Sequence, residues 1–302
     1  MPTRFVDLPG RATRFDYEAI DAEAHRLWIA HLGDSTVVAV DIDTLAVVAE
    51  VADVAGAHGV AVAPARHLVY ATATTSNEVV AIDSVTFAIV RRGATGAFPD
   101  GVAYDAVHDL VLVTNKSDGT ITVHDPDTLA VVRTFKLGDE TGNVVSDPTT
   151  GLAYAAALPP NRLVTFDPTL DDVISTVELT GCDGAHGVVV PPGAARAYVA
   201  CENNAKLIIV DLLTAGTVLA ATDVASNPDV LAYDPGTAHL FVGSESSNLD
   251  RFDVSGARPV DLGRQKIDGG AHVVAVDPVS HRLFVPLASA SGGPKLAVIT
   301  PG

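Results

Sequence analysis

Short apolar runs separated by polar turns fill the chain, and they come in groups of four. One group contains the runs Val60–Ala63, Leu68–Ala71, Val79–Asp83 and Ala88–Arg91. Each run is short and rich in β-branched or small apolar residues, and turn-forming residues separate it from the next. This pattern is typical of β-strands and not of helices. The chain is therefore predicted to be all-β, with four strands in each group.

The groups repeat with a constant period of 42 or 43 residues. The segment Gly56–Val62 returns as Gly184–Val190 and as Gly270–Val276, each with His in the third position, while Phe98–Tyr104 and Asn227–Tyr233 carry Asp there. We call this third position the slot. Its seven residues are Asp16, His58, Asp100, Asn143, His186, Asp229 and His272. Four strands per unit at this period predict a seven-bladed β-propeller, a single domain over residues 1–302.

The last repeat is one strand short. Residues Gly270–Pro301 supply three apolar runs, and Thr3–Leu8 form a strand without a partner in their own unit. Joining the two would close the ring and remove the open sheet edges. We expect the N-terminal strand to be the outer strand of blade seven.

One of the second-strand segments connects the chain to a known family. Leu112-Val113-Thr114-Asn115, followed by Gly119-Thr120-Ile121-Thr122-Val123-His124-Asp125, resembles the YVTN-type β-propeller repeat. The resemblance covers nearly the whole chain and implies the fold. It implies no particular function, because such propellers include lactonases, lyases, redox enzymes and binding proteins.

Charge and hydropathy exclude several classes of partner. The net charge is −18, from 37 acidic and 19 basic side chains without a basic cluster. An acidic surface repels polyanions, so we expect no nucleic-acid binding. No apolar run approaches the length of a membrane span, and Met1–Leu8 contains no apolar signal core. The expected location is the cytoplasm, and the expected partner is a small-molecule substrate.

The slot residues should form a polar ring at one mouth of the central channel, because the first strand of each propeller blade lines that channel. His58, His186 and His272 are spread around the ring and could bind Zn²⁺ or another transition metal. Mg²⁺ and Ca²⁺ prefer oxygen ligands and fit three imidazoles less well. Asp100 and Asp229 could act as general bases or orient the imidazoles. In the alternative interpretation, neighbouring Asp and His side chains merely satisfy one another around water.

Loops on the same face add further candidates. Asp16 and Asn143 complete the ring, and Glu202 and Glu245 could serve as extra ligands or as a base. Cys182 and Cys201 lie in one repeat unit. We interpret them as unrelated small core residues, with a disulfide or soft metal ligands as the alternatives.

The slot residues of this chain resemble those of two enzyme families, and each comparison also shows a difference. Gluconolactonase-type propellers carry Asp in a Pro-Asp-Gly segment, as at Pro99-Asp100-Gly101, but have six blades and a Glu where Asp16 stands. Streptogramin B lyases are similar in having seven blades and slot histidines in the last two; His272 matches one, and Asp229 replaces the other. These resemblances imply lactone hydrolysis or elimination.

We therefore expect a metal-dependent hydrolase or lyase in which His272, His186 or His58 acts as a ligand or acid/base. The alternative is a non-catalytic scaffold that binds a peptide or protein on this face.

Overall fold

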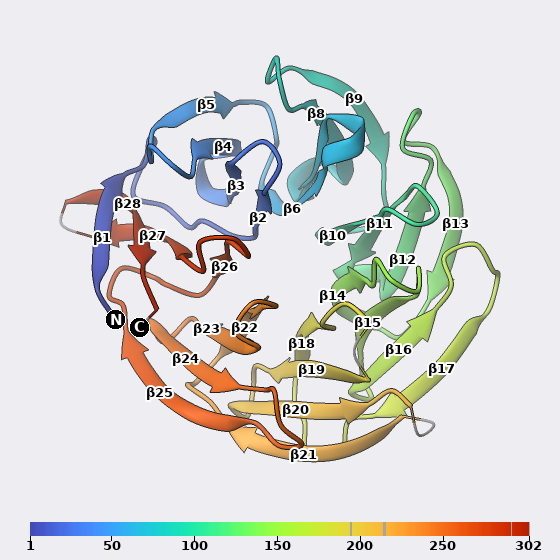
Figure 1. Ribbon diagram of the computed structural model, residues 1–302. Coiled ribbons are helices and arrows are strands. Elements are labelled where there is room, and N and C mark those ends of the chain that lie inside the picture. Colours follow the sequence, from blue (N-terminus) through green and yellow to red (C-terminus); the bar gives the residue numbers. More distant parts are fainter. Residues whose placement is uncertain (194, 214–215, 291, 302) are drawn as a thin grey trace.

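The computed structural model describes residues 1–193, 195–213, 216–290 and 292–301. It consists of seven four-stranded antiparallel sheets arranged as the blades of a ring (Figure 1). The all-β prediction and the seven-bladed propeller are confirmed. We number the blades one to seven from the sheet that contains β2.

The strands follow one another from the centre of the ring outward in each blade. Blade one contains β2 (Glu18–Asp21), β3 (Arg26–His31), β4 (Thr36–Asp41) and β5 (Val47–Val51). Blade two contains β6 (Ala57–Ala63), β7 (Leu68–Ala73), β8 (Glu78–Asp83) and β9 (Ile89–Ala94). Blade three contains β10 (Pro99–Asp105), β11 (Leu110–Asn115), β12 (Thr120–His124) and β13 (Val131–Lys136).

The other blades repeat this order. Blade four contains β14 (Glu140–Ser146), β15 (Ala153–Leu158), β16 (Arg162–Phe166) and β17 (Val173–Glu178). Blade five contains β18 (Ala185–Val189), β19 (Arg196–Cys201), β20 (Lys206–Asp211) and β21 (Thr217–Asp223). Blade six contains β22 (Pro228–Asp234), β23 (His239–Ser244), β24 (Asn248–Asp253) and β25 (Val260–Lys266). Short 3-10 turns follow several strands: η1 (Leu32–Asp34), η2 (Pro64–Arg66), η3 (Thr74–Ser76) and η4 (Lys116–Asp118).

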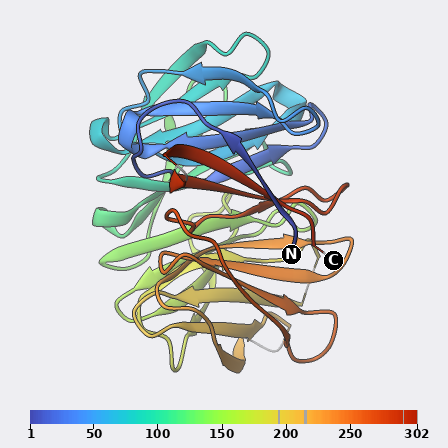
Figure 2. The ribbon, with the colours of Figure 1, turned by 90° about the vertical axis from the view of Figure 1, so that its left-hand side faces the viewer.

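Blade seven is completed by the N-terminal strand, as predicted. It contains β26 (Ala275–Val276), β27 (Leu283–Ala290), β28 (Gly293–Ile299) and β1 (Thr3–Asp7). Strand β1 pairs antiparallel with β28, from Thr3 opposite Ile299 to Asp7 opposite Lys295. The chain ends lie side by side in both ribbon views (Figures 1 and 2).

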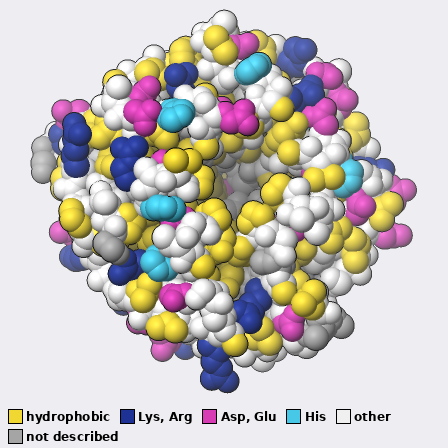
Figure 3. Space-filling view, viewed as in Figure 1, with side chains coloured by type: hydrophobic (Ala, Val, Ile, Leu, Met, Phe, Trp, Pro, Cys, Tyr) yellow, Lys and Arg dark blue, Asp and Glu magenta, His cyan; other side chains and the backbone are white. Residues whose placement is uncertain are grey.

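The apolar core lies between neighbouring blades. One cluster joins blades one and two through Trp28, Val37, Val60, Val69 and Val80. Another joins blades seven and one through Leu8, Phe15, Leu27 and Phe284. Small and β-branched side chains dominate the first cluster, whereas leucine and phenylalanine make up half of the second. The sheets pack closely through these side chains around a central hollow (Figure 3).

The two cysteines form a disulfide, with a Cα–Cα distance of 5.4 Å between Cys182 and Cys201. Our interpretation of them as unrelated core residues is therefore wrong. Cys201 ends β19, whereas Cys182 lies in the loop before β18. The loop brings the two side chains together, a contact that their sequence separation of 19 residues does not reveal.

In five blades the first strand has a β-bulge near its start. In β6 the pairing with β7 shifts between Ala57 and Val60, so that His58 and Gly59 together face one residue, Thr72. The same shift occurs in β10, β14, β18 and β22. A bulge bends the strand and redirects the side chain it carries. The fold therefore sets the direction of the slot side chains through a repeated local irregularity.

Candidate active site at the centre of the ring

A cavity of about 280 Å³ lies where the inner strands begin. Its lining residues are Arg14, Asp16, His58, Asp100, Lys116, His186, Glu202, Asn203, Asn227, Asp229 and Glu245. Seven of them were predicted from the sequence: Asp16, His58, Asp100, His186, Glu202, Asp229 and Glu245. We call this space the central cavity. All its lining side chains are polar or charged. When the histidines are neutral, five carboxylates (Asp16, Asp100, Glu202, Asp229 and Glu245) face the two cations Arg14 and Lys116.

Arg14 connects blade one to blade six across the cavity. Its Nε lies 2.8 Å from Asp16 Oδ2, its Nη1 lies 2.6 Å from Glu245 Oε1, and an Nη2 contact of 3.5 Å reaches Asp229 Oδ2. Burial alone would lower the pKa of Arg14, but these three carboxylates raise it. The guanidinium therefore stays charged and compensates part of the acidic ring.

His58 lies between two buried carboxylates. Its Nε2 is 3.4 Å from Asp16 Oδ2 and 3.7 Å from Asp100 Oδ1, and its Nδ1 is 3.2 Å from the Thr74 hydroxyl. Asp100 is 2% exposed, and its Oδ1 has no hydrogen-bond partner among the described residues. Lys116 approaches the other Asp100 oxygen only to 3.9 Å. This side of the cavity thus offers a buried, unsatisfied acceptor beside an imidazole and an ammonium group.

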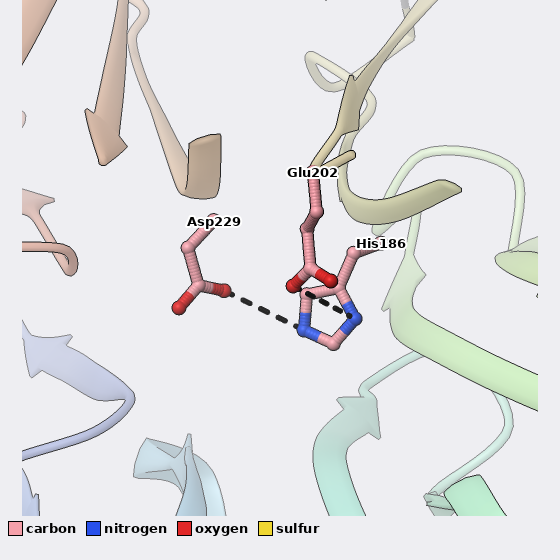
Figure 4. A group of neighbouring side chains, drawn as sticks. All are labelled: His186, Glu202 and Asp229. Carbon is pink, nitrogen blue, oxygen red and sulfur yellow. Dashed lines mark ion pairs between the residues drawn. The ribbon is translucent and has the colours of Figure 1, made fainter. Parts of the chain in front are cut away.

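On the opposite side, His186 lies between Glu202 and Asp229 (Figure 4) and also contacts the Tyr17 hydroxyl. Its Nε2 lies 3.1 Å from the Tyr17 hydroxyl and 3.5 Å from Asp229 Oδ1, and its Nδ1 lies 3.7 Å from Glu202 Oε1. One ligand atom each from His186, Glu202 and Asp229 falls within 4.8 Å of the others. Asp229 Oδ1 is buried and has no hydrogen-bond partner within the described part of the chain. An imidazole and two carboxylates, one of them unsatisfied, fit a divalent transition metal.

The predicted three-histidine metal site is not formed. In the described ranges, the group of three above is the one whose ligand atoms converge on a common point. His272 lies apart: its Nδ1 is 3.0 Å from the Gly270 carbonyl, and its Nε2 is 3.9 Å from Asp16 Oδ2, beyond hydrogen-bonding distance. The ring is wide enough that each slot histidine faces neighbouring carboxylates instead of another imidazole. His272 and Asn143 do not line the central cavity.

Asn143 lies one position beyond its expected place. Val144 pairs with Ala155 as Val60 pairs with Ala71, so that Gly142 is level with His58 and Asn143 is level with Gly59. A Cβ atom on Gly101 would overlap Asn143 Oδ1, which shows how closely Asn143 approaches blade three. Blade four therefore contributes glycine to the slot, and the ring contains six slot side chains.

The pKa values of the two buried acids Asp16 and Asp229 are shifted in opposite directions. Burial alone would raise the pKa of Asp16, but the charges of His58, His272 and Arg14 hold it well below its usual value. Burial raises the pKa of Asp229 to about 6, because His186 only partly opposes it and Asp16 adds repulsion. Separated carboxyl pKa values within one site are typical of general acid–base pairs. The pKa of His272 lies above its usual value. Burial alone would lower it, but the carboxylates of Asp16 and Asp229 stabilise the protonated imidazole.

Arg14 and Tyr17 were not predicted from the sequence. Arg14 lies two positions before the slot, where blades two, five and seven carry glycine, so the repeat does not single it out, and its partner Glu245 in blade six is more than 200 residues away. Tyr17 is buried and packs against Val230 and Val273, so its aromatic character alone indicates core. Its pKa is raised well above the usual value by burial and by the surrounding carboxylates. The hydroxyl therefore stays protonated beside His186.

Replacing Arg14 by Gln should destabilise the protein in a pH-dependent way. Removing one partner of a fully buried ion pair costs about 3–5 kcal/mol, and we expect about 2 kcal/mol because the Arg14 side chain is 41% exposed. The loss should be larger at pH 8 than at pH 5, where Asp229 is protonated. Urea unfolding at both pH values measures it, with Arg14→Lys as the charge-retaining control. An equal loss at both pH values would contradict the predicted dependence on Asp229.

Glu18 is a second unsatisfied acid, located two residues after the slot where β6 has Val60. Neither carboxylate oxygen has a hydrogen-bond partner in the described structure, and burial raises the Glu18 pKa well above its usual value. An acid with a raised folded-state pKa stabilises the fold least at high pH. Its contribution is lost as pH rises above the unfolded-state pKa of about 4.3.

Glu18→Gln should therefore increase the free energy of unfolding. The gain should grow with pH by at most about 1.4 kcal/mol per unit until the folded-state pKa is reached. Chemical unfolding between pH 5 and pH 9 tests this, with the exposed Glu23→Gln as the matched control. A gain that does not change with pH would show that ionisation of Glu18 is not the cause.

Comparison with known proteins supports the fold alone. No family model matches the chain, and none of the curated proteins does. A hydrazine synthase structure from Kuenenia stuttgartiensis superposes with a TM-score of 0.84 at 18% identity, over 98% of this chain and 97% of that one. The WD40 repeats of RRP9 superpose with a TM-score of 0.84 at 9% identity, over 99% and 97%. The YVTN assignment stays a prediction.

Proposed function

We propose that the central cavity is the active site of a metal-dependent enzyme acting on a small polar molecule, by hydrolysis or elimination. The observation that carries the proposal is the convergence of His186, Glu202 and Asp229, whose ligand atoms lie within 4.8 Å of one another. This group replaces the three-histidine site expected from the sequence. Zn²⁺ or another divalent transition metal suits an imidazole and two carboxylates better than Mg²⁺ or Ca²⁺ does.

Such a metal would supply Lewis-acid polarisation of a substrate carbonyl or carboxyl oxygen. The residues of this chain would do the rest. His58, on the other side of the cavity and oriented by Asp100, would accept and return a proton. Arg14 would hold Asp16 and Glu245 in place, and Tyr17 would fix the orientation of the His186 ring. The volume of about 280 Å³ restricts the substrate to a small molecule.

The experiment is elemental analysis and metal titration of protein purified without a metal-affinity tag, followed by assays on lactones and elimination substrates. We expect one equivalent of a transition metal and metal-dependent turnover of a small substrate. Failure to bind metal after reconstitution would overturn the metal site. Stoichiometric metal without any turnover would favour the non-catalytic scaffold.

The location of the protein belongs to the same proposal. No helix in the described ranges is long and apolar enough to cross a membrane. The Cys182–Cys201 disulfide counts against our expectation of a cytoplasmic protein, because cytosolic thiols are normally kept reduced. We expect neither nucleic acid nor membrane as a partner.

A further inference from the structure

Asp100 lies in the half of the central cavity opposite the proposed metal site, and within the described ranges it is a buried hydrogen-bond acceptor without a donor. Asp100 is 2% exposed, it lines the cavity, and its Oδ1 has no hydrogen-bond partner among the residues described. The nearest basic side chains stay beyond hydrogen-bonding distance: His58 Nε2 is 3.7 Å from Oδ1, and Lys116 Nζ is 3.9 Å from Oδ2. A buried carboxylate oxygen without a donor is costly, so a ligand that brings an N–H or O–H group would satisfy it.

An exposed aromatic ring on an unusual backbone contacts His58, the neighbour of Asp100. Phe98 has φ of +56° and is 40% exposed, and its ring centroid lies 5.7 Å from that of His58. The corresponding residues two positions before the slot also have positive φ, at Gly56, Gly184, Asn227 and Gly270. Those blades use glycine or asparagine, which tolerate this conformation, whereas a bulky side chain does so rarely. Blade three thus keeps an exposed phenyl ring where the backbone disfavours it, which is typical of a functional contact.

The charges of the cavity indicate which donor fits. Five carboxylates face the two cations Arg14 and Lys116, which leaves three negative charges when the histidines are neutral. A divalent metal ion would compensate two of them, and one monovalent cation would compensate the third. An ammonium group meets both local requirements, since it donates to a carboxylate and binds favourably beside an aromatic ring.

We propose that Asp100 and Phe98 form a subsite for a small protonated amine, so that the substrate is an amine-bearing molecule. The ammonium group donates to Asp100 Oδ1, and the organic part lies against the Phe98 ring at the rim. As the specificity subsite of the same cavity, this inference rests on the proposed function. The amine and the metal bind different residues, so the two can be tested separately.

The test compares 2-phenylethylammonium with its neutral analogue 2-phenylethanol, by calorimetry and by thermal shift, on protein loaded with Zn²⁺ and on protein without metal. We expect the amine to bind at least tenfold more tightly than the alcohol in both forms. Asp100→Asn should remove this preference and leave the Zn²⁺ affinity within about threefold of the parent. Phe98→Ala should weaken both probes, and the exposed Asp172→Asn is the matched charge control.

The outcomes separate the two proposals. Equal binding of amine and alcohol to the parent protein, or a preference that survives in Asp100→Asn, would overturn the amine subsite whether or not Zn²⁺ binds. An amine preference that depends on Asp100 in a protein that binds no metal would support the subsite and overturn the metal site.

Discussion

His186→Ala is expected to abolish stoichiometric metal binding and the turnover that depends on it. The imidazole is 6% exposed and faces Glu202 and Asp229, so its loss leaves two carboxylates that repel each other and no nitrogen ligand. We expect the metal affinity to fall by at least 100-fold, more than the 10–100-fold typical of losing a group that only supports a ligand. Isothermal titration with Zn²⁺ and elemental analysis of the purified variant measure it.

Two further variants make this result specific. His67→Asn alters an exposed histidine at positive φ, a conformation that asparagine accepts, and should leave metal binding unchanged. The double variant His58→Ala/His272→Ala removes the other two slot histidines and should keep one equivalent of metal. Loss of metal from the double variant, with retention in His186→Ala, would reject the His186–Glu202–Asp229 site.

Cys182→Ser/Cys201→Ser should destabilise the protein by about 3 kcal/mol, the loss expected when a cross-link closing a loop of this length is removed. The disulfide also connects the two segments that carry His186 and Glu202, two of the three proposed metal ligands. Cys201 directly precedes Glu202 and pairs with Ala185, which directly precedes His186. We therefore expect the metal affinity to decrease as well, by about tenfold.

Urea unfolding with and without reductant measures the stability, and Zn²⁺ titration measures the affinity. The double variant provides the control, because reductant should destabilise the parent protein and leave the variant unchanged. Equal stability of the parent under oxidising and reducing conditions would show that the cross-link does not contribute.

The sequence predicts the architecture well because the repeat period determines the number of blades and the strands in each. One glycine-rich segment repeated at 42 or 43 residues identifies the inner strands, and the missing strand of the last unit identifies β1 as the closing strand. The period also aligns an aspartate at the end of the third strand in six blades, and each of these residues accepts a main-chain N–H group of the following turn: Asp41, Asp83, Asp125, Asp167, Asp211 and Asp253.

Six of the seven residues assigned to the slot do lie there, but their contacts were not predicted. Repeats align residues along the chain only approximately: β14 has the same bulge as β6, but its pairing with β15 places Gly142 and not Asn143 in the slot. Contacts across the ring depend on its diameter, so the sequence indicated convergence of three histidines where the structure pairs each with carboxylates. Arg14 was missed because blades two, five and seven carry glycine at its position in the repeat, so the pattern gives that position no chemistry.

The pairing of β1 with β28 also determines when the protein can begin to function. Thr3 must wait for Ile299 before its strand has a partner, so the earliest strand to leave the ribosome is among the last to be placed. Arg14 follows this strand and reaches Glu245 of blade six only in a closed ring. A nascent chain that has made six blades therefore holds β1 without its partner strand, and its Arg14 has not yet been brought to Glu245. Its open sheet edges stay exposed to pairing with another chain until blade seven has been synthesised.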